Sequence, residues 1–274
     1  MSGLIKTAWH RTTAKKLPIL EEIESFGSEG EETVYRTLCE AFDCVIRNAV
    51  VPHKELYLEK DFLVIHKGDA FVIEVKNWKG EIGAEGDHFY QNKDNGTRKT
   101  LKSPVGTTRQ FIERMRAFYG IERELHGMVV FCEPNCRLHL PEQMDGIALL
   151  QAQNMVSYIK KTAKVEKTLH PIDPARILRC TRFYSKESEF CKGILADCFF
   201  DCENTAGDIL RVDTTCLRYL SVEPQPLLMR DKLMVTYTNG ASDIFYNRDT
   251  VFTVACLDGS YRKISLNRIR HIVF

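Results

Sequence analysis

The sequence predicts an α/β (α+β) protein in which a mixed central sheet is flanked by helices and is followed by a small, mostly-β module. Three observations favour this class. Residues Asp61–Gly80 contain two β-rich runs joined by a Lys-Gly turn, the pattern of a tight hairpin. Segments with helical spacing of apolar residues precede and follow that hairpin. Near the C-terminus, an Asn-Gly and an Asp-Gly dipeptide separate further runs of strand composition.

The composition is that of a soluble globular protein with a sizeable core. The chain has 274 residues, of which 44% are hydrophobic and 27% charged, and this length suits one large or two modest domains. We expect a first domain over residues 1–165, a linker over 166–186 that contains Pro171 and Pro174, and a β-rich accessory module over 187–274.

No part of the sequence is typical of a membrane protein. Apolar runs stay well short of the ~18–20 residues that a membrane span requires, so we expect no membrane partner. The first residues, MSGLIKTAWHRTTAKK, lack the apolar centre of a signal peptide, and we therefore expect a cytoplasmic location.

Apolar periodicity and turn residues predict the order of elements in the first domain. The expected elements are helices at Leu17–Ser25 and from Ser28 through TVYRTLCEAF, a strand at Asp43–Val51, the hairpin, a small hairpin extension after Gly80 with a turn at Asn95-Gly96, a helix from Pro104 to about Leu125, strands at Gly127–Phe131 and Gly146–Leu150, and a closing helix at Gln153–Thr162. This order gives a mixed sheet with helices on both sides.

The C-terminal module is predicted to be antiparallel. Leu227–Phe274 contains three or four strand-like runs, which imply a small sheet or a barrel-like module. The preceding stretch, Gly193–Leu220, is ambiguous between helix and strand.

The hairpin places charged side chains together at its open end. With Lys67 and Gly68 as the turn, Asp61 faces Glu74 across the two strands, and Glu74 and Lys76 share one face. Two carboxylates directly opposite each other are unfavourable unless a cation lies between them. A divalent metal site is therefore the functional interpretation, and a surface salt bridge between Lys76 and a carboxylate is the structural alternative.

Three separate stretches resemble one family. FGSEGEETVYRTL (Phe26–Leu38), KDFLVI and FVIEVKNWKG are similar to the nuclease-related domain (NERD), a branch of the PD-(D/E)XK nuclease-like superfamily. The resemblance covers about residues 17–160 and keeps the family's order of motifs. It implies a restriction-endonuclease-like sheet and a metal-dependent nuclease.

The resemblance also implies roles for individual residues. The glycine-rich start of the family's first helix falls on Gly27, Gly30 and Glu31, and the hairpin acid falls on Asp61. The Glu-x-Lys motif falls on Glu74 and Lys76. The family's Pro-then-Gln helix start falls on Pro104 and Gln110, and there this sequence departs from the pattern, because GTT (Gly106–Thr108) looks inserted.

These residues suggest a mechanism of phosphodiester hydrolysis. Mg²⁺ (or Mn²⁺) would be bound by the Asp61 and Glu74 carboxylates and by the Val75 carbonyl, because these cations prefer oxygen ligands. Lys76 would position or deprotonate the attacking water. Glu31 is either a helix cap, or a residue near the metal, or both. We therefore expect a nuclease that acts on DNA rather than RNA, either as an endonuclease or as a nickase. The alternative is a catalytically silent module that binds nucleic acid or a protein.

The net charge of +1 means that nucleic acid must bind to local basic patches. Candidates are Arg109 and Arg114 on the helix after Pro104, although a solvated face of mixed charge is the favoured explanation for them. The last strands offer a second set of candidates, with Tyr261 among them: Arg262, Lys263, Arg268 and Arg270. Positive charge that protects an exposed sheet edge is the alternative for this set.

Ten cysteines are many for a cytoplasmic chain. A zinc site would use Cys132, Cys136 and His139, or else Cys198 and Cys202, but neither set has the spacing of paired zinc knuckles. Buried thiols are the alternative. Because cutting both strands of a duplex often needs two active sites, a homodimer is a further expectation.

Overall fold

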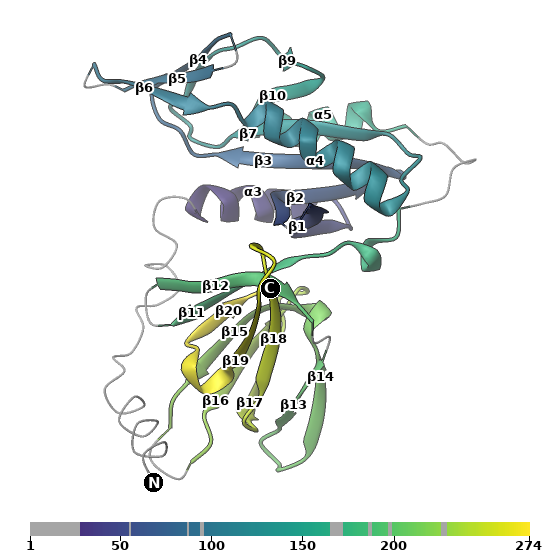
Figure 1. Ribbon diagram of the computed structural model, residues 1–274, viewed down its shortest axis with the longest axis vertical. Helices are drawn as coiled ribbons and strands as arrows, with labels where there is room; N and C mark the ends of the chain where they lie inside the picture. Colours follow the sequence, from purple (N-terminus) through teal and green to yellow (C-terminus); the bar gives the residue numbers. More distant parts are fainter. Residues whose placement is uncertain are drawn as a thin grey trace. The chain divides into compact units, whose positions relative to one another are not determined.

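The computed structural model of the protein describes residues 28–54, 56–86, 88–93, 96–164, 172–185, 188–196, 199–225 and 229–274 (Figure 1). The chain divides after Leu178 into two compact units. Two predicted features lie outside the described residues: the Leu17–Ser25 helix, and Asn95 of the predicted Asn95-Gly96 turn. None of the described helices is long and apolar enough to cross a membrane.

The first unit is built on a six-stranded sheet in the order β1-β2-β3-β7-β10-β9. Its strands are β1 (Val45–His53), β2 (Leu56–His66), β3 (Asp69–Lys76), β7 (Leu125–Phe131), β9 (Gln143–Met144) and β10 (Ile147–Gln151). The β3–β7 and β7–β10 pairs are parallel, and the remaining pairs are antiparallel. The predicted mixed sheet is confirmed.

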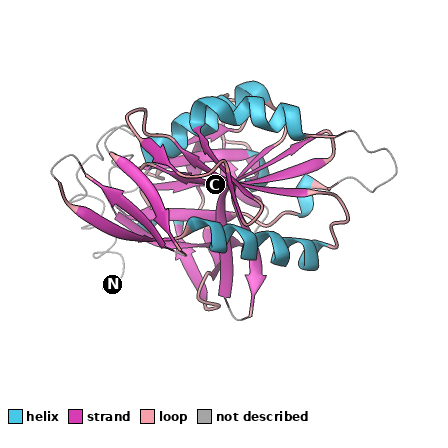
Figure 2. Cartoon of the chain, turned by 90° about the horizontal axis from the view of Figure 1, so that it is seen from above, coloured by secondary structure: helices cyan, strands magenta, loops and turns pink. Residues whose placement is uncertain are grey.

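Helices cover both faces of this sheet (Figures 1 and 2). Helices α3 (Ser28–Ala41) and α5 (Ala152–Thr162) share one apolar core, in which Leu38 and Ile159 are fully buried. Helix α4 (Pro104–Tyr119) packs Phe111 and Met115 into a second core on the opposite face. The predicted flanking helices are therefore confirmed, and they fix the sheet from both sides.

Helix α4 begins as the sequence predicts but ends earlier. The Ser103 hydroxyl accepts a hydrogen bond from the Val105 N–H, and Pro104 occupies the first helical position. At the other end Gly120 adopts a left-handed conformation with φ of 62° and terminates the helix. The predicted extension of this helix to Leu125 is wrong, because Gly120 ends the helix five residues earlier.

The expected hairpin extension is a larger element, a four-stranded sheet. Its order is β6 (Arg98–Lys102), β5 (His88–Asn92), β4 (Glu81–Glu85) and β8 (Arg137–His139). Strand β8 follows β7 and pairs with β4 in parallel. This long-range pair ties the extension back to the main sheet, which local turn signals could not predict.

The second unit is an antiparallel sheet of ten strands, and five of them lie within Leu227–Phe274, where the sequence predicts three or four. The strands are β11 (Cys180–Ser185), β12 (Ser188–Leu195), β13 (Phe199–Glu203), β14 (Ile209–Asp213), β15 (Leu217–Glu223), β16 (Lys232–Tyr237), β17 (Ser242–Asn247), β18 (Val251–Cys256), β19 (Tyr261–Ser265) and β20 (His271–Val273). Strand β11 lies within the range expected as a linker, and the ambiguous stretch forms strands β12 to β15 with a single-turn helix at Thr214–Cys216.

This sheet is an internal repeat. Phe199 pairs with Asp213, and Val251 pairs with Ser265, so both partners shift by the same 52 positions (251 − 199 and 265 − 213). The same shift relates β11 to β16, β12 to β17 and β15 to β20, and it relates the single-turn helix at Thr214–Cys216 to that at Leu266–Arg268. The module therefore consists of two equivalent halves.

The two halves exchange a hairpin. The β13–β14 hairpin pairs with β17 of the second half, and the β18–β19 hairpin pairs with β12 of the first. The sheet order thus contains two equivalent strand groups, group A (β20-β11-β12-β18-β19) and group B (β15-β16-β17-β13-β14). The rings of Phe200 and Phe252, one from each exchanged hairpin, pack 5.6 Å apart in a single core.

The shared core gives a direct stability prediction. Phe200→Ala should destabilise the C-terminal unit by about 3–5 kcal/mol, because it removes a buried ring from contact with Phe252. The matched control is Phe199→Ala on the same strand, whose ring is 51% exposed and should cost under about 1 kcal/mol. Hydrogen exchange of the β13 and β18 peptides measures both variants, and equal losses would contradict the assignment of the core.

Candidate active site

The candidate site forms where strands β2 and β3 separate. Their ladder runs from the pair His66 and Asp69 to the pair Phe62 and Ile73, in the predicted register. Both turn residues between the strands have positive φ, 54° at Lys67 and 96° at Gly68, as a tight primed turn requires. The sequence prediction of this hairpin is therefore confirmed.

Beyond that ladder the Asp61 side chain replaces a main-chain acceptor. The Val75 N–H donates to Asp61 Oδ2 over 2.7 Å. The Asp61 carboxylate is consequently held against the strand that carries Glu74 and Lys76. The end of the β2–β3 ladder therefore places the Asp61 carboxylate beside strand β3.

Glu74 lies between two lysines. Lys60 Nζ is 2.6 Å from Glu74 Oε2, and Lys76 Nζ donates to Glu74 Oε1. Lys60 is 4% exposed and also donates to the Thr107 hydroxyl of α4 over 3.3 Å. The structure therefore brings Asp61, Glu74 and Lys76 together, as the sequence predicts, and adds a second, buried cation.

The two carboxylates differ in their ionisation. Burial, followed by the negative charges of Glu74 and Glu31, raises the pKa of Asp61 to about 7, although the Val75 N–H and Lys76 act in the opposite direction. Burial also raises the pKa of Glu74, but Lys60 and Lys76 outweigh it and the net pKa is lowered. The site thus combines an ionised carboxylate with one that titrates near neutral pH.

A close helix contact explains why Glu31 influences Asp61. A Cβ atom on Gly30 would lie 2.3 Å from the Cys132 sulfur and 3.2 Å from the Asn77 side chain, so only glycine fits there. This contact holds the N-terminal part of α3 against the ends of β3 and β7. Glu31 follows directly, and its charge is one of those that raise the pKa of Asp61.

Helix α4 reaches the site through Thr107 rather than Gln110. Gln110 was expected on the first turn, but it is the seventh residue of the helix. Its amide nitrogen lies 3.5 Å from His53 Nε2 at the end of β1. The expected position of Gln110 is wrong, because Gly106–Thr108 fill the first turn and carry Gln110 about one turn further along.

The predicted phosphate-binding residues are not part of this cluster. Arg109 forms an exposed ion pair with Asp145 at 3.2 Å, and Arg114 is exposed on α4. In the C-terminal unit Arg262, Lys263 and Arg268 are exposed, whereas Arg270 is partly buried. His271, which follows Arg270, is 2% exposed and stacks on Tyr184, so it adds nothing to an exposed basic face.

Sequence reasoning missed Lys60 and Thr107. Lys60 directly precedes Asp61, and strict alternation along a strand would place the two side chains on opposite faces. Because β2 leaves β3 at this point, both reach the Glu74 segment. The only signal was an unexpected lysine beside the apolar run FLVI.

The oxygen donors of the site fit a hard divalent cation. The Lys76 carbonyl accepts from the Cys132 N–H on the β7 side, whereas the Val75 N–H points to β2. Since the N–H and C=O of one strand residue point the same way, the Val75 carbonyl faces Asp61. Two carboxylates and one carbonyl are ligands that Mg²⁺ accepts, with water completing its shell. Among the described residues, no three His, Cys, Asp or Glu side chains form a metal-binding group by themselves.

The zinc site considered for the cysteines gains no support from the described residues. Burial raises the pKa of Cys132 and of Cys136 to about 11, and Cys136 is 2% exposed, as expected for buried thiols. The Cys132 thiol donates to the Lys76 carbonyl at 3.7 Å. Cys198 lies outside the described residues.

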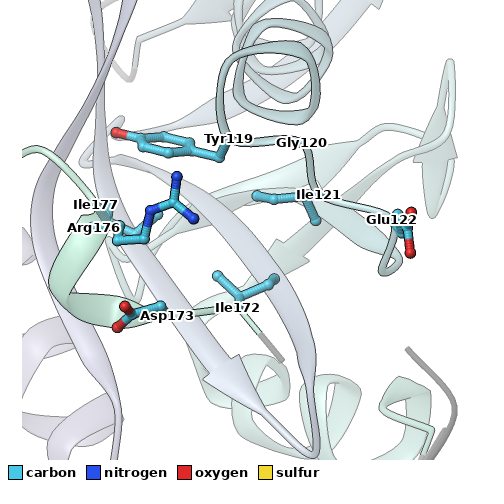
Figure 3. A pocket seen from close by; sticks show the side chains of 8 residues that line it. All are labelled: Tyr119, Gly120, Ile121, Glu122, Ile172, Asp173, Arg176 and Ile177. Atoms are coloured by element: carbon cyan, nitrogen blue, oxygen red, sulfur yellow. The ribbon is translucent and has the colours of Figure 1, made fainter. Parts of the chain in front are cut away.

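A small pocket of about 170 Å³ lies at the opposite end of α4 (Figure 3). The side chains around it include Tyr119, Ile121, Ile172 and Arg176. Tyr119 is twelve residues beyond Thr107, which corresponds to about 18 Å along a helix. The pocket therefore does not belong to the carboxylate cluster.

Comparison with known families identifies the domain that carries this cluster. Residues 26–132 match the nuclease-related domain (NERD) family. The match extends from the start of α3 to the end of β7 and includes Glu31, Asp61, Glu74 and Lys76. No curated protein and no solved structure matches the chain.

The raised pKa of Asp61 predicts a pH-dependent effect of neutralising it. Asp61 has a folded pKa of about 7 against an ordinary value of 3.8, so its stabilising effect is complete below pH 4 and is lost as pH rises to 7. Asp61→Asn, which mimics the protonated acid, should match the metal-free parent near pH 4. It should be more stable by about 2–4 kcal/mol at pH 8.

Urea denaturation of metal-free protein between pH 4 and pH 8 measures this difference. The control is Asp145→Asn, which neutralises an exposed carboxylate and should give a nearly flat difference. An Asp61→Asn variant whose advantage does not grow with pH would argue against a raised pKa.

Proposed function

We propose that this nuclease-related domain hydrolyses phosphodiester bonds in DNA with the help of a divalent cation bound at Asp61 and Glu74. The observation that carries the proposal is the convergence of these carboxylates from two adjacent strands, with Lys76 bonded to Glu74. Such an arrangement is costly without a cation, because burial first and the negative charge of Glu74 second raise the pKa of Asp61.

The Asp61 and Glu74 carboxylates and the Val75 carbonyl would hold the cation, Mg²⁺ or Mn²⁺. When bound, the cation supplies charge neutralisation on the phosphoryl oxygens and lowers the pKa of a coordinated water. Asp61 must lose its proton to become a ligand. The site should therefore work best at and above neutral pH.

Of the two lysines bonded to Glu74, Lys76 is the one that we place next to the reacting phosphate. Its ammonium bonds to Glu74, and its side chain is 24% exposed, so solvent and substrate can reach it. We assign it to orienting the attacking water and to stabilising the negative charge that develops on the phosphate.

Lys60 has a positioning role in this proposal. It is buried and bonds to both Glu74 and Thr107, so it fixes the Glu74 carboxylate against helix α4. Its charge also lowers the pKa of Glu74. Glu74 is thereby kept ionised and in one orientation without contact between Lys60 and substrate.

A second candidate is a catalytically silent module that binds nucleic acid or a protein. One observation favours it: each Glu74 oxygen already has a lysine partner. In that case the cluster would be a stable ion network and nothing more. A cleavage assay separates the two candidates.

The nuclease proposal predicts metal-dependent nicking of plasmid DNA that depends on Lys76. Lys76→Ala should slow cleavage at least about 100-fold, because the water and the phosphate charge lose their cation. Lys99→Ala, an exposed lysine on β6, is the matched control and should cut normally. Gel assays with Mg²⁺, Mn²⁺ or EDTA, on plasmid and on RNA of the same sequence, measure the effect and the substrate preference.

Equal cutting by the Lys76→Ala variant would trace the activity to a contaminant. A protein that binds DNA in both forms and cuts in neither would support the silent module.

The positioning role predicts a steeper pH profile for Lys60→Met. Removing the Lys60 charge raises the pKa of Glu74, so the pH profile of kcat/KM should show a second protonation below the one that Asp61 sets at about pH 7, and the rate should fall more steeply in acid. Lys60→Arg retains the charge and should restore the parental slope. A Lys60→Met variant with reduced rate but an unchanged slope of the acidic limb would leave Lys60 with a packing role only.

A further inference from the structure

The two strand groups of the C-terminal unit have diverged at equivalent positions. In group B, Leu210, Arg211, Cys216 and Ile244 line an open pocket of about 780 Å³. The 52-residue shift relates these four positions to the following residues of group A: Arg262, Lys263, Arg268 and Lys192. Largely apolar positions in one group are thus basic in the other.

Cross-strand partners make the difference in charge larger. In group B, Arg211 faces Asp201, and the two form an ion pair at 3.3 Å. In group A the equivalent residue, Lys263, faces Thr253, which carries no charge. The positive charge of Lys263 therefore lacks the cross-strand acid that offsets that of Arg211.

The same strand adds an exposed aromatic ring. Tyr261 begins β19 and is 74% exposed, and its equivalent in group B is Ile209. Arg262, Lys263 and Arg268 are exposed as well. An exposed ring and exposed cations along one strand are the features that single-stranded nucleic acid binds, through base stacking and phosphate contacts.

Among the described residues, two acids lie on the strands of group A and in the β18–β19 turn, Glu189 and Asp258. Glu189 is exposed on β12, and the 52-residue shift relates it to Ala241 of group B. Asp258, in the β18–β19 turn, is close enough to Arg262 for the arginine to contribute to a lowered pKa of Asp258, after two hydrogen bonds from Ser260. These hydrogen bonds, from the Ser260 N–H and hydroxyl, occupy one oxygen of the Asp258 carboxylate. The acids are thus outnumbered by the cations of group A.

We propose that the surface formed by Tyr261, Arg262, Lys263 and Arg268 binds the phosphate backbone of single-stranded nucleic acid, and that the equivalent surface of group B does not. The inference rests on the proposed function only in taking nucleic acid as the substrate class. It assigns the two halves of one repeat to different tasks. The hairpin exchange keeps both halves in one sheet while their surfaces differ.

Fluorescence anisotropy with a labelled single-stranded DNA oligonucleotide in EDTA tests this proposal, because binding is then measured without cleavage. The triple variant R262A/K263A/R268A should bind at least about tenfold more weakly. It should also lower the slope of log affinity against log salt by about 2, at ~0.7 for each phosphate that the variant no longer neutralises. Tyr261→Ala should weaken the binding of single strands more than that of duplex.

The repeat supplies a matched control. Arg211→Ala and Lys263→Ala remove one positive charge from equivalent strand positions, and only the second should weaken binding. All substituted side chains are exposed, so thermal unfolding curves should stay unchanged and exclude misfolding.

Three results would overturn the proposal. They are parental affinity of the triple variant, equal losses for Arg211→Ala and Lys263→Ala, and displacement of the oligonucleotide by polyglutamate of the same charge at the same concentration. Failure of the nuclease proposal can be distinguished from failure of this one. A protein that binds through these residues and never cuts would contradict the nuclease proposal alone. A protein that cuts normally while the triple variant binds normally sinks this one alone.

Discussion

The hydrogen bond from the Val75 N–H to the Asp61 carboxylate is the interaction on which the candidate site depends. It takes the place of a ladder bond at the point where β2 and β3 separate, and so it draws a carboxylate into a largely apolar sheet. The charges of Lys60 and Lys76 lower the pKa of Glu74 next to it, whereas the Val75 N–H and Lys76 do not offset the burial and the negative charges that raise the pKa of Asp61. A cation bound here would restore the balance, which is the physical basis of the nuclease proposal.

The central hairpin could be predicted because its register is set locally. A Lys-Gly turn with two positive φ angles fixes which residues face each other as far as Phe62 and Ile73, and this register makes Asp61 and Glu74 the next residues along the two strands without any knowledge of the fold. Lys60 and Thr107 could not be predicted. Their contact depends on the divergence of two strands and on a helix 47 residues away along the chain. The position of Gln110 failed for a related reason, since Gln110 is the seventh residue of α4 and lies beyond its first turn.

The C-terminal unit shows a different limit of sequence reasoning. Its strands are short, and the exchanged hairpins pair with strands of the other half, so local turn signals reveal only part of the sheet. Equivalent residues such as Val212 and Ile264, or Leu220 and Ile272, share burial but rarely identity. The repeat is therefore visible in the register of strand pairing rather than in the amino-acid sequence. Divergence on the exposed positions, from Leu210 to Arg262 for example, leaves that register intact.

Crystals grown with Mn²⁺ and measured for anomalous scattering test the central claim most directly. The account predicts a peak bonded to one oxygen of Asp61 and one of Glu74, with the Val75 carbonyl as a further ligand, at distances close to 2.2 Å, about the range for such cations. The same crystals of the Asp61→Asn variant should lose the peak. A map at saturating Mn²⁺ with no density between Asp61 and Glu74, and with both lysines still bonded to Glu74, would contradict it.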